Sequence, residues 1–170
     1  MNSTTGTTGG IKNSDTLVYR VLRIDQLQKS FNLIPSSTPY SPCLIHNDFS
    51  PGNILVKDGH LTAVIDWDNA VVDTTPLDFV KMKYWTAKDS RGQLSHEPAL
   101  FRAFVDGYGP RGTEIVQSEI FALYEALWLL RVFNFEISKQ ESGLECAPGY
   151  PEAAVYAEFL TDVLARLPLN

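Results

Sequence analysis

Four polar residues in the middle of the chain have types and spacings that could serve one reaction. Asp48 is followed five residues later by Asn53, His46 stands two residues before Asp48, and Asp66 comes thirteen residues after Asn53. Amide and carboxylate oxygens are the hard donors that Mg²⁺ accepts beside substrate phosphates and water. A further carboxylate can orient a hydroxyl and take its proton, and phosphoryl transfer asks for little more from a protein. The pattern predicts that Asn53 and Asp66 bind the metal and that Asp48 accepts the proton.

A predicted β-hairpin explains how Asp66 can return to Asn53. Residues 54–56 are rich in β-formers, residues 57–60 contain an Asp-Gly pair typical of tight hairpin turns, and residues 61–65 alternate as a second strand. The hairpin carries the chain out and back, so we expect its two ends to lie side by side.

The sequence around these residues resembles the aminoglycoside phosphotransferase family. The segment 46–56, His-Asn-Asp-Phe-Ser-Pro-Gly-Asn-Ile-Leu-Val, keeps the Asp-to-Asn spacing of the protein-kinase catalytic loop. The segment 63–70, Ala-Val-Ile-Asp-Trp-Asp-Asn-Ala, has the Ile-Asp-Trp that replaces Asp-Phe-Gly in this family, and Pro-Leu-Asp-Phe at 76–79 resembles the family's usual helix start. The resemblance covers residues 40–138, and the wider group includes choline kinase and homoserine kinase relatives.

This resemblance implies an α+β fold: the mainly helical C-terminal lobe of a protein-kinase-like fold, with a short β-hairpin carrying the catalytic loop. It implies that Asp48 is the catalytic base and that Asn53 and Asp66 bind Mg²⁺ and the nucleotide, ATP or another NTP. His46 and Asp78 would support the catalytic loop. An acid at a helix N-terminus, favoured by the helix dipole, explains Asp78 equally well. The implied activity is transfer of the γ-phosphoryl group to a hydroxyl of a small molecule.

Four other acids are candidates for substrate binding. Asp68 and Asp73 could line a site for a cationic substrate, or they could be ordinary loop acids. Glu119 and Glu125 lie on a predicted long helix, and such helices contribute substrate contacts in the family. Glu125 stands within an apolar stretch, so a buried acid satisfied by neighbours is an equally good interpretation.

Apolar periodicity predicts helices beyond Pro76 at about 76–87, 97–107, 113–138 and 151–166, the third of them buried. Residues 15–31 favour an amphipathic helix, with a strand over 18–24 as the alternative. Residues 1–14 have the composition of a disordered tail, since the glycines at 6–10 follow no strand that would make them a phosphate loop. The lobe would then span 15–170.

Composition narrows the classes of partner. The net charge of −6 argues against nucleic acid as the main partner. It is typical of a solvated acidic surface, and it mildly favours a cationic small molecule as the ligand. The two cysteines, without metal-site spacing, suggest buried thiols, and the absence of a signal peptide or long apolar run suggests a cytoplasmic protein. The three tryptophans are expected in the core, and His60 and His96 in solvent.

The segment ahead of the motif raises a separate question. A complete member of the resembled family has an N-terminal nucleotide lobe, and only about 45 residues precede His46 here. Weak nucleotide affinity is therefore expected of the isolated chain. Three explanations stay open: part of a longer kinase, a catalytically inactive lobe serving as a binding or scaffolding module, or a lobe completed by a partner or by self-association.

Overall fold

The computed structural model describes residues 40–87, 94–96, 98–144 and 151–167. The expected tail at 1–14, the expected helix at 15–31 and Cys146 lie outside these residues. None of the described helices is long and apolar enough to cross a membrane.

Helices make up most of the described chain, as the apolar periodicity predicts. They are α2 (Pro76–Ala87), α3 (Ala99–Tyr108), α4 (Pro110–Val116), α5 (Glu119–Glu141) and α6 (Ala153–Arg166). The predicted bounds of α2 are confirmed, and those of α3 and α6 are confirmed to within two residues. The helical lobe with a short hairpin that the sequence led us to expect is therefore the fold class observed.

The single helix predicted over 113–138 is wrong, because two helices occupy this region. Ser118 has an extended backbone, and its hydroxyl accepts a hydrogen bond from the Phe121 amide (3.2 Å), which caps the start of α5. The Pro-Arg-Gly segment at 110–112 lies in the gap between the predicted helices at 97–107 and 113–138, but it forms the first turn of α4.

Two small antiparallel sheets carry the polar motif. Strand β2 (Ile54–Lys57) pairs with β3 (His60–Val64), and β1 (Cys43–Ile45) pairs with β4 (Val71–Asp73). The hairpin turn is confirmed at Asp58 and Gly59, whose φ angles of 52° and 76° suit Asp-Gly. Strand β4 was not predicted, and its pairing with β1 brings the two ends of the motif back to one place.

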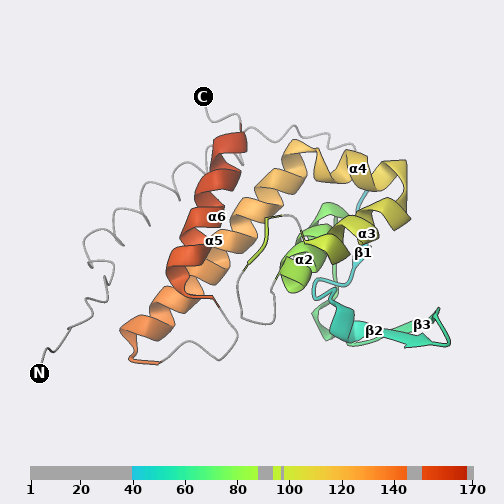
Figure 1. Ribbon diagram of the computed structural model, residues 1–170, viewed down its shortest axis with the longest axis horizontal. Coiled ribbons are helices and arrows are strands. Elements are labelled where there is room, and N and C mark those ends of the chain that lie inside the picture. Colours follow the sequence, from blue (N-terminus) through green and yellow to red (C-terminus); the bar gives the residue numbers. More distant parts are fainter. Residues whose placement is uncertain (1–39, 88–93, 97, 145–150, 168–170) are drawn as a thin grey trace, which may run out of the picture.

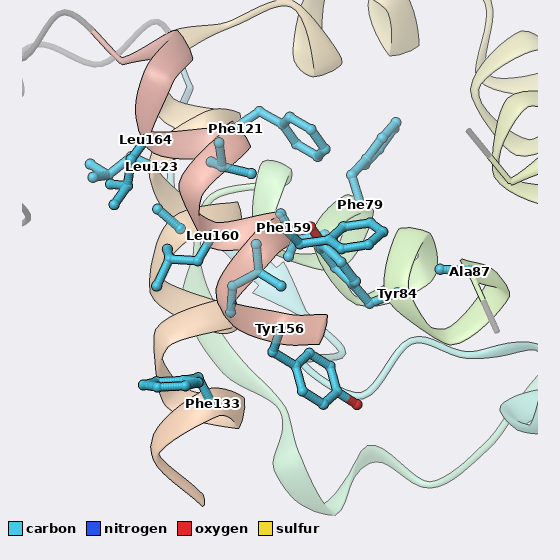
Figure 2. Packing of buried hydrophobic residues seen from close by; sticks show 14 of the residues in the cluster. Phe79, Tyr84, Ala87, Phe121, Leu123, Phe133, Tyr156, Phe159, Leu160 and Leu164 are labelled. Atoms are coloured by element: carbon cyan, nitrogen blue, oxygen red, sulfur yellow. The ribbon is translucent and has the colours of Figure 1, made fainter. Parts of the chain in front are cut away.

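The hydrophobic core lies chiefly among α2, α5 and α6, and α3 and α4 add Phe101, Val105 and Ile115 to it. Helices α5 and α6 run side by side over most of their lengths, whereas the β2–β3 hairpin projects away from the helices (Figure 1). Figure 2 shows side chains from α2, α5 and α6 meeting, with Tyr84, Phe159 and Leu160 among those that are almost fully buried. The core thus holds α2 firmly, and α2 directly follows the motif.

Two predictions about burial are wrong. Trp67 and Trp85 are 45% and 42% exposed, and only Trp128 packs inward, stacked on Tyr84. Trp67 lies on a single 3₁₀ turn, η2 (Trp67–Asn69), which offers no core-facing side. Cys43 is an exposed free thiol instead of a buried one, because the short strand β1 buries only Ile45. His60 and His96 are exposed, as expected.

Candidate active site

The first turn of α2 holds the loop that follows β1. Both oxygens of the Asp78 carboxylate accept backbone amides of this loop at 2.8 Å, from His46 and from Asn47. A carboxylate that accepts two amides fixes the path of the backbone more firmly than one contact would. Since α2 is anchored in the core, Asp78 transfers that rigidity to the loop that carries Asp48.

His46 connects this loop to the residue before Asp66. It is 1% exposed, and its Nε2 lies 2.8 Å from the Ile65 carbonyl oxygen. The Asp48 amide donates to His46 Nδ1 (3.3 Å), so Nδ1 is the acceptor and Nε2 carries the proton donated to Ile65. Both ring nitrogens are therefore engaged in joining segments of backbone, which is the arrangement of a scaffold residue.

Asn53 closes the loop from the other side. It ends the 3₁₀ turn η1 (Pro51–Asn53), and its Nδ2 donates to the Asp48 carbonyl oxygen (2.9 Å). Its own carbonyl oxygen accepts the Ile65 amide (2.9 Å) across the base of the hairpin. Asn53 and Asp66 are thereby brought together as the hairpin predicts, with the amide oxygen of Asn53 left as the atom that can meet a cation.

Asp66 and Asn47 have left-handed backbones, with φ angles of 65° and 59°. Aspartate and asparagine tolerate this region better than most residues, and such strain concentrates at functional sites. Asn47 is held there by a hydrogen bond from its Nδ2 to the Asn69 carbonyl oxygen (3.1 Å). The turn η2, which begins directly after Asp66, is thus tied to the loop that carries Asp48.

The donor set fits a magnesium ion bound with phosphates, and does not fit a cage made of protein alone. In the described part of the chain no group of three or more His, Cys, Asp or Glu residues could hold a metal. Asn53 and Asp66 supply two hard oxygen donors, and Mg²⁺ commonly completes such a set with phosphate oxygens and water.

Asp73 and Asp68 lie in different surroundings. Asp73 accepts the Thr74 amide (2.7 Å) and the Tyr124 hydroxyl, so its carboxylate connects β4 to α5. Burial, reinforced by the bond to Asp73, raises the pKa of Tyr124 to about 12. Asp68 is exposed on η2, two residues from Asp66.

Glu125 belongs to the core and not to the loop. It is fully buried, and its carboxylate receives Lys83, the Tyr84 hydroxyl (2.8 Å) and Arg166 (2.8 Å). Burial and the neighbouring Glu125 raise the pKa of Tyr84. The geometry therefore supports the satisfied buried acid, one of the two interpretations of Glu125. Glu119 is exposed in the first turn of α5.

Sequence reasoning missed a cation on the helix that braces the loop. Lys81 stands on α2, one turn after Asp78, and is half-buried. Burial, followed by repulsion from Arg131 of α5, lowers the pKa of Lys81, and attraction to Asp48 and Asp78 partly offsets this. The position of Lys81, three residues after Asp78 on a predicted helix, could have pointed to it from the sequence. No feature of the sequence pointed to Arg131.

The sequence of this chain is similar to a known protein family. Residues 11–117 match the model of the phosphotransferase enzyme family. No curated protein matches significantly. One similar solved structure is described as the gentamicin–APH(2″)-IIa complex, with 17% identity and a TM-score of 0.43 over 94% of this chain and 53% of the other. The chain spans about half the length of that structure.

Proposed function

The chain belongs to the phosphotransferase enzyme family, and from that premise we propose that it transfers the γ-phosphoryl group of ATP or another NTP to a hydroxyl of a small molecule. The observation that carries the proposal is the junction of Asp48, Asn53 and Asp66. Hydrogen bonds of the His46 ring, of the Asn53 side chain and across the base of the hairpin link the three segments of backbone. We propose that this site belongs to a lobe spanning 15–170.

Each residue has a role that its contacts support. Asp48 orients the acceptor hydroxyl and takes its proton, because its side chain is half-buried on a loop braced by Asp78. Asn53 and Asp66 would hold Mg²⁺ through an amide and a carboxylate oxygen. When bound, Mg²⁺ neutralises charge on the phosphates. His46 keeps the two halves of the site in register, since it contacts both.

The variant Asp48→Asn tests the assignment. The carboxylate supplies the proton acceptor, so its loss should lower the rate of phosphoryl transfer by roughly 10²-fold or more. The measurement is transfer from γ-labelled ATP to a panel of hydroxyl acceptors: aminoglycosides, amino alcohols and sugars. Circular dichroism and a urea titration would verify that the variant folds.

A matched control is available in the hairpin turn. Asp58→Asn makes the same chemical change at an exposed position, where asparagine also accepts a positive φ. It should leave transfer unchanged. Equal turnover by Asp48→Asn and wild type would remove Asp48 from the reaction.

A second candidate function is a non-catalytic binding or scaffolding lobe. The observation that favours it is a set of apolar side chains on the two sheets, each more than 60% exposed: Leu44, Val56, Leu61 and Val72. Apolar surface of this kind promotes association with a partner or a second copy. Titration with Mg²⁺–ATP, followed through the fluorescence of Trp67, separates the candidates. Micromolar binding supports the enzyme, and no response at millimolar nucleotide supports the binding module.

A further inference from the structure

Two consecutive residues of the loop after β1 hold the chain on both sides of Asp66. Before Asp66, the Ile65 carbonyl oxygen accepts a hydrogen bond from the buried ring of His46 (2.8 Å). After Asp66, the Asn69 carbonyl oxygen accepts one from Nδ2 of Asn47 (3.1 Å). Both acceptors belong to the backbone, so these bonds restrain the path of the chain. Asp66 therefore lies between two points at which its segment is fastened to the loop.

The backbone of Asp66 needs such restraint. Its φ and ψ angles of 65° and 58° lie in the left-handed region, which is costly for a residue other than glycine. A backbone of this kind persists only where the surrounding structure holds it. Trp67, at the start of η2, contacts the His46 ring with 4.7 Å between ring centroids, and Asn47 holds the end of η2 at Asn69.

Asn47 is suited to this contact by its type and by its own backbone. Its φ of 59° is also left-handed, a conformation that asparagine tolerates better than most residues. Its amide donates to one oxygen of Asp78 (2.8 Å), so α2 fixes the backbone from which the side chain extends. A side chain on a fixed backbone loses little further freedom when it forms a hydrogen bond. An asparagine amide can donate to a carbonyl oxygen, which an ionised aspartate cannot do.

We propose that Asn47 is a positioning residue, which holds Asp66 where its carboxylate can meet a metal ion bound beside Asp48. The inference rests on the function proposed above. Asn47 directly precedes Asp48, and Asn69 follows Asp66 by three residues, so one hydrogen bond restrains the proton acceptor and the metal-binding carboxylate relative to each other. Loss of this bond would allow η2 and Asp66 to relax. The expected consequence is weaker binding of Mg²⁺ in a chain that still folds.

The variant Asn47→Gly removes the side chain and keeps the backbone. Glycine adopts the left-handed region readily, so the urea midpoint should stay near that of wild type. In the protein without ligand, the Ala70 amide, which closes η2 by donating to the Trp67 carbonyl oxygen (2.9 Å), should exchange its hydrogen roughly fivefold faster. The Ile65 amide, bonded across the base of the hairpin, should exchange as in wild type. NMR follows both amides in one sample.

The effect on the metal is measured with a nucleotide that is not turned over. When Mg²⁺ is titrated at a fixed concentration of ADP, calorimetry should show that Asn47→Gly needs roughly fivefold more Mg²⁺ for half-saturation than wild type. Asp58→Gly is the matched control, because it replaces another left-handed residue (φ 52°) in the turn of the projecting hairpin (Figure 1). This control should keep the wild-type exchange of Ala70 and the wild-type requirement for Mg²⁺.

Unchanged exchange of Ala70 in Asn47→Gly would overturn the proposal, because the bond would then not hold η2. Faster exchange with an unchanged requirement for Mg²⁺ would also overturn it, since Asn47 would then support the turn and not the metal site. Lack of Mg²⁺-dependent ADP binding by wild type would reject the proposal together with the metal site. If wild type binds Mg²⁺–ADP but transfers no phosphoryl group, the proposed enzyme fails, and weaker Mg²⁺ binding by Asn47→Gly would still uphold the role of Asn47.

Discussion

The phenol of Tyr124 connects the strand before α2 to the central helix. It donates to Asp73 and accepts from the Thr74 hydroxyl (3.2 Å). Burial, with the bond to Asp73, raises the pKa of Tyr124 from 10.0 to about 12. Between these values the unfolded chain has released the phenol proton and the folded chain still holds it. The stability that Tyr124 contributes is therefore complete below about pH 10 and is lost as the pH rises toward 12.

Tyr124→Phe should remove this pH dependence. Wild type should lose more of its urea midpoint between about pH 9 and about pH 11 than the variant does, because only wild type has this phenol to titrate. Tyr108→Phe, which alters an exposed tyrosine, is the control for general effects of alkaline pH. Parallel curves for wild type and Tyr124→Phe would show that the Asp73 contact does not hold the proton.

Among single residues, the spacing of polar residues in the sequence pointed to those of the loop and not to those of the neighbouring helices. That Asn53 and Asp66 come together could be predicted, because a hairpin, which is a local structure, sets their separation. Lys81 and Arg131 depend on how α2 and α5 pack, and packing is not visible in the spacing of one segment. Trp67 was misplaced for a related reason, since its exposure follows from a 3₁₀ turn that has no periodic pattern.

The junction of α3 and α4 depends on the absence of one side chain. A Cβ built on Gly112 would lie 2.6 Å from the Val105 carbonyl oxygen and 3.0 Å from the Tyr108 Cβ. The first of these is backbone, so it cannot move aside cheaply. Glycine therefore allows the two helices to approach closely, although it weakens the helix that contains it.

Two glycine substitutions should have opposite effects on stability. Gly112→Ala forces α3 and α4 apart and should lower the free energy of unfolding by about 1–3 kcal/mol. Gly107→Ala, in α3, meets no atom within 4 Å and should raise it by up to about 1 kcal/mol. Urea denaturation of the three proteins measures both effects. Stabilisation by Gly112→Ala would contradict the close approach.

Helices of this chain were predictable where an apolar stripe runs unbroken. The bounds of α2 follow from Pro76 and the periodicity after it. The break between α4 and α5 was missed because apolar residues continue on both sides of it. The feature that marks the break is the hydrogen bond by which Ser118 caps the start of α5, and apolar periodicity does not reveal such a bond. Strand β4 is three residues long, and only its pairing with β1 makes it a strand.

The residues that stabilise the fold and the residues of the proposed site lie in different parts of the molecule. The core lies among the helices, chiefly α2, α5 and α6, and the hairpin projects away from it (Figure 1). Asp78 links the loop to α2, and His46 links the loop to the hairpin. A ligand at the site therefore adds links that the core does not supply. A ligand that binds the folded state and not the unfolded state should therefore raise the free energy of unfolding of the whole chain.

Mg²⁺–ATP should therefore raise the thermal unfolding midpoint. A ligand at a concentration of about 100 times its dissociation constant raises the free energy of unfolding by about 2.7 kcal/mol. For a chain of this size, each kcal/mol raises the unfolding midpoint by about 2–4 °C. Asp66→Asn should abolish most of the shift, because it removes the carboxylate proposed to hold the metal. Asp68→Asn makes the same change two residues later, at an exposed position, and should keep the shift. Scanning calorimetry with and without EDTA makes the comparison. A shift that persists in Asp66→Asn, or that survives removal of Mg²⁺, would mean that the nucleotide binds without the metal site that Asn53 and Asp66 are proposed to form.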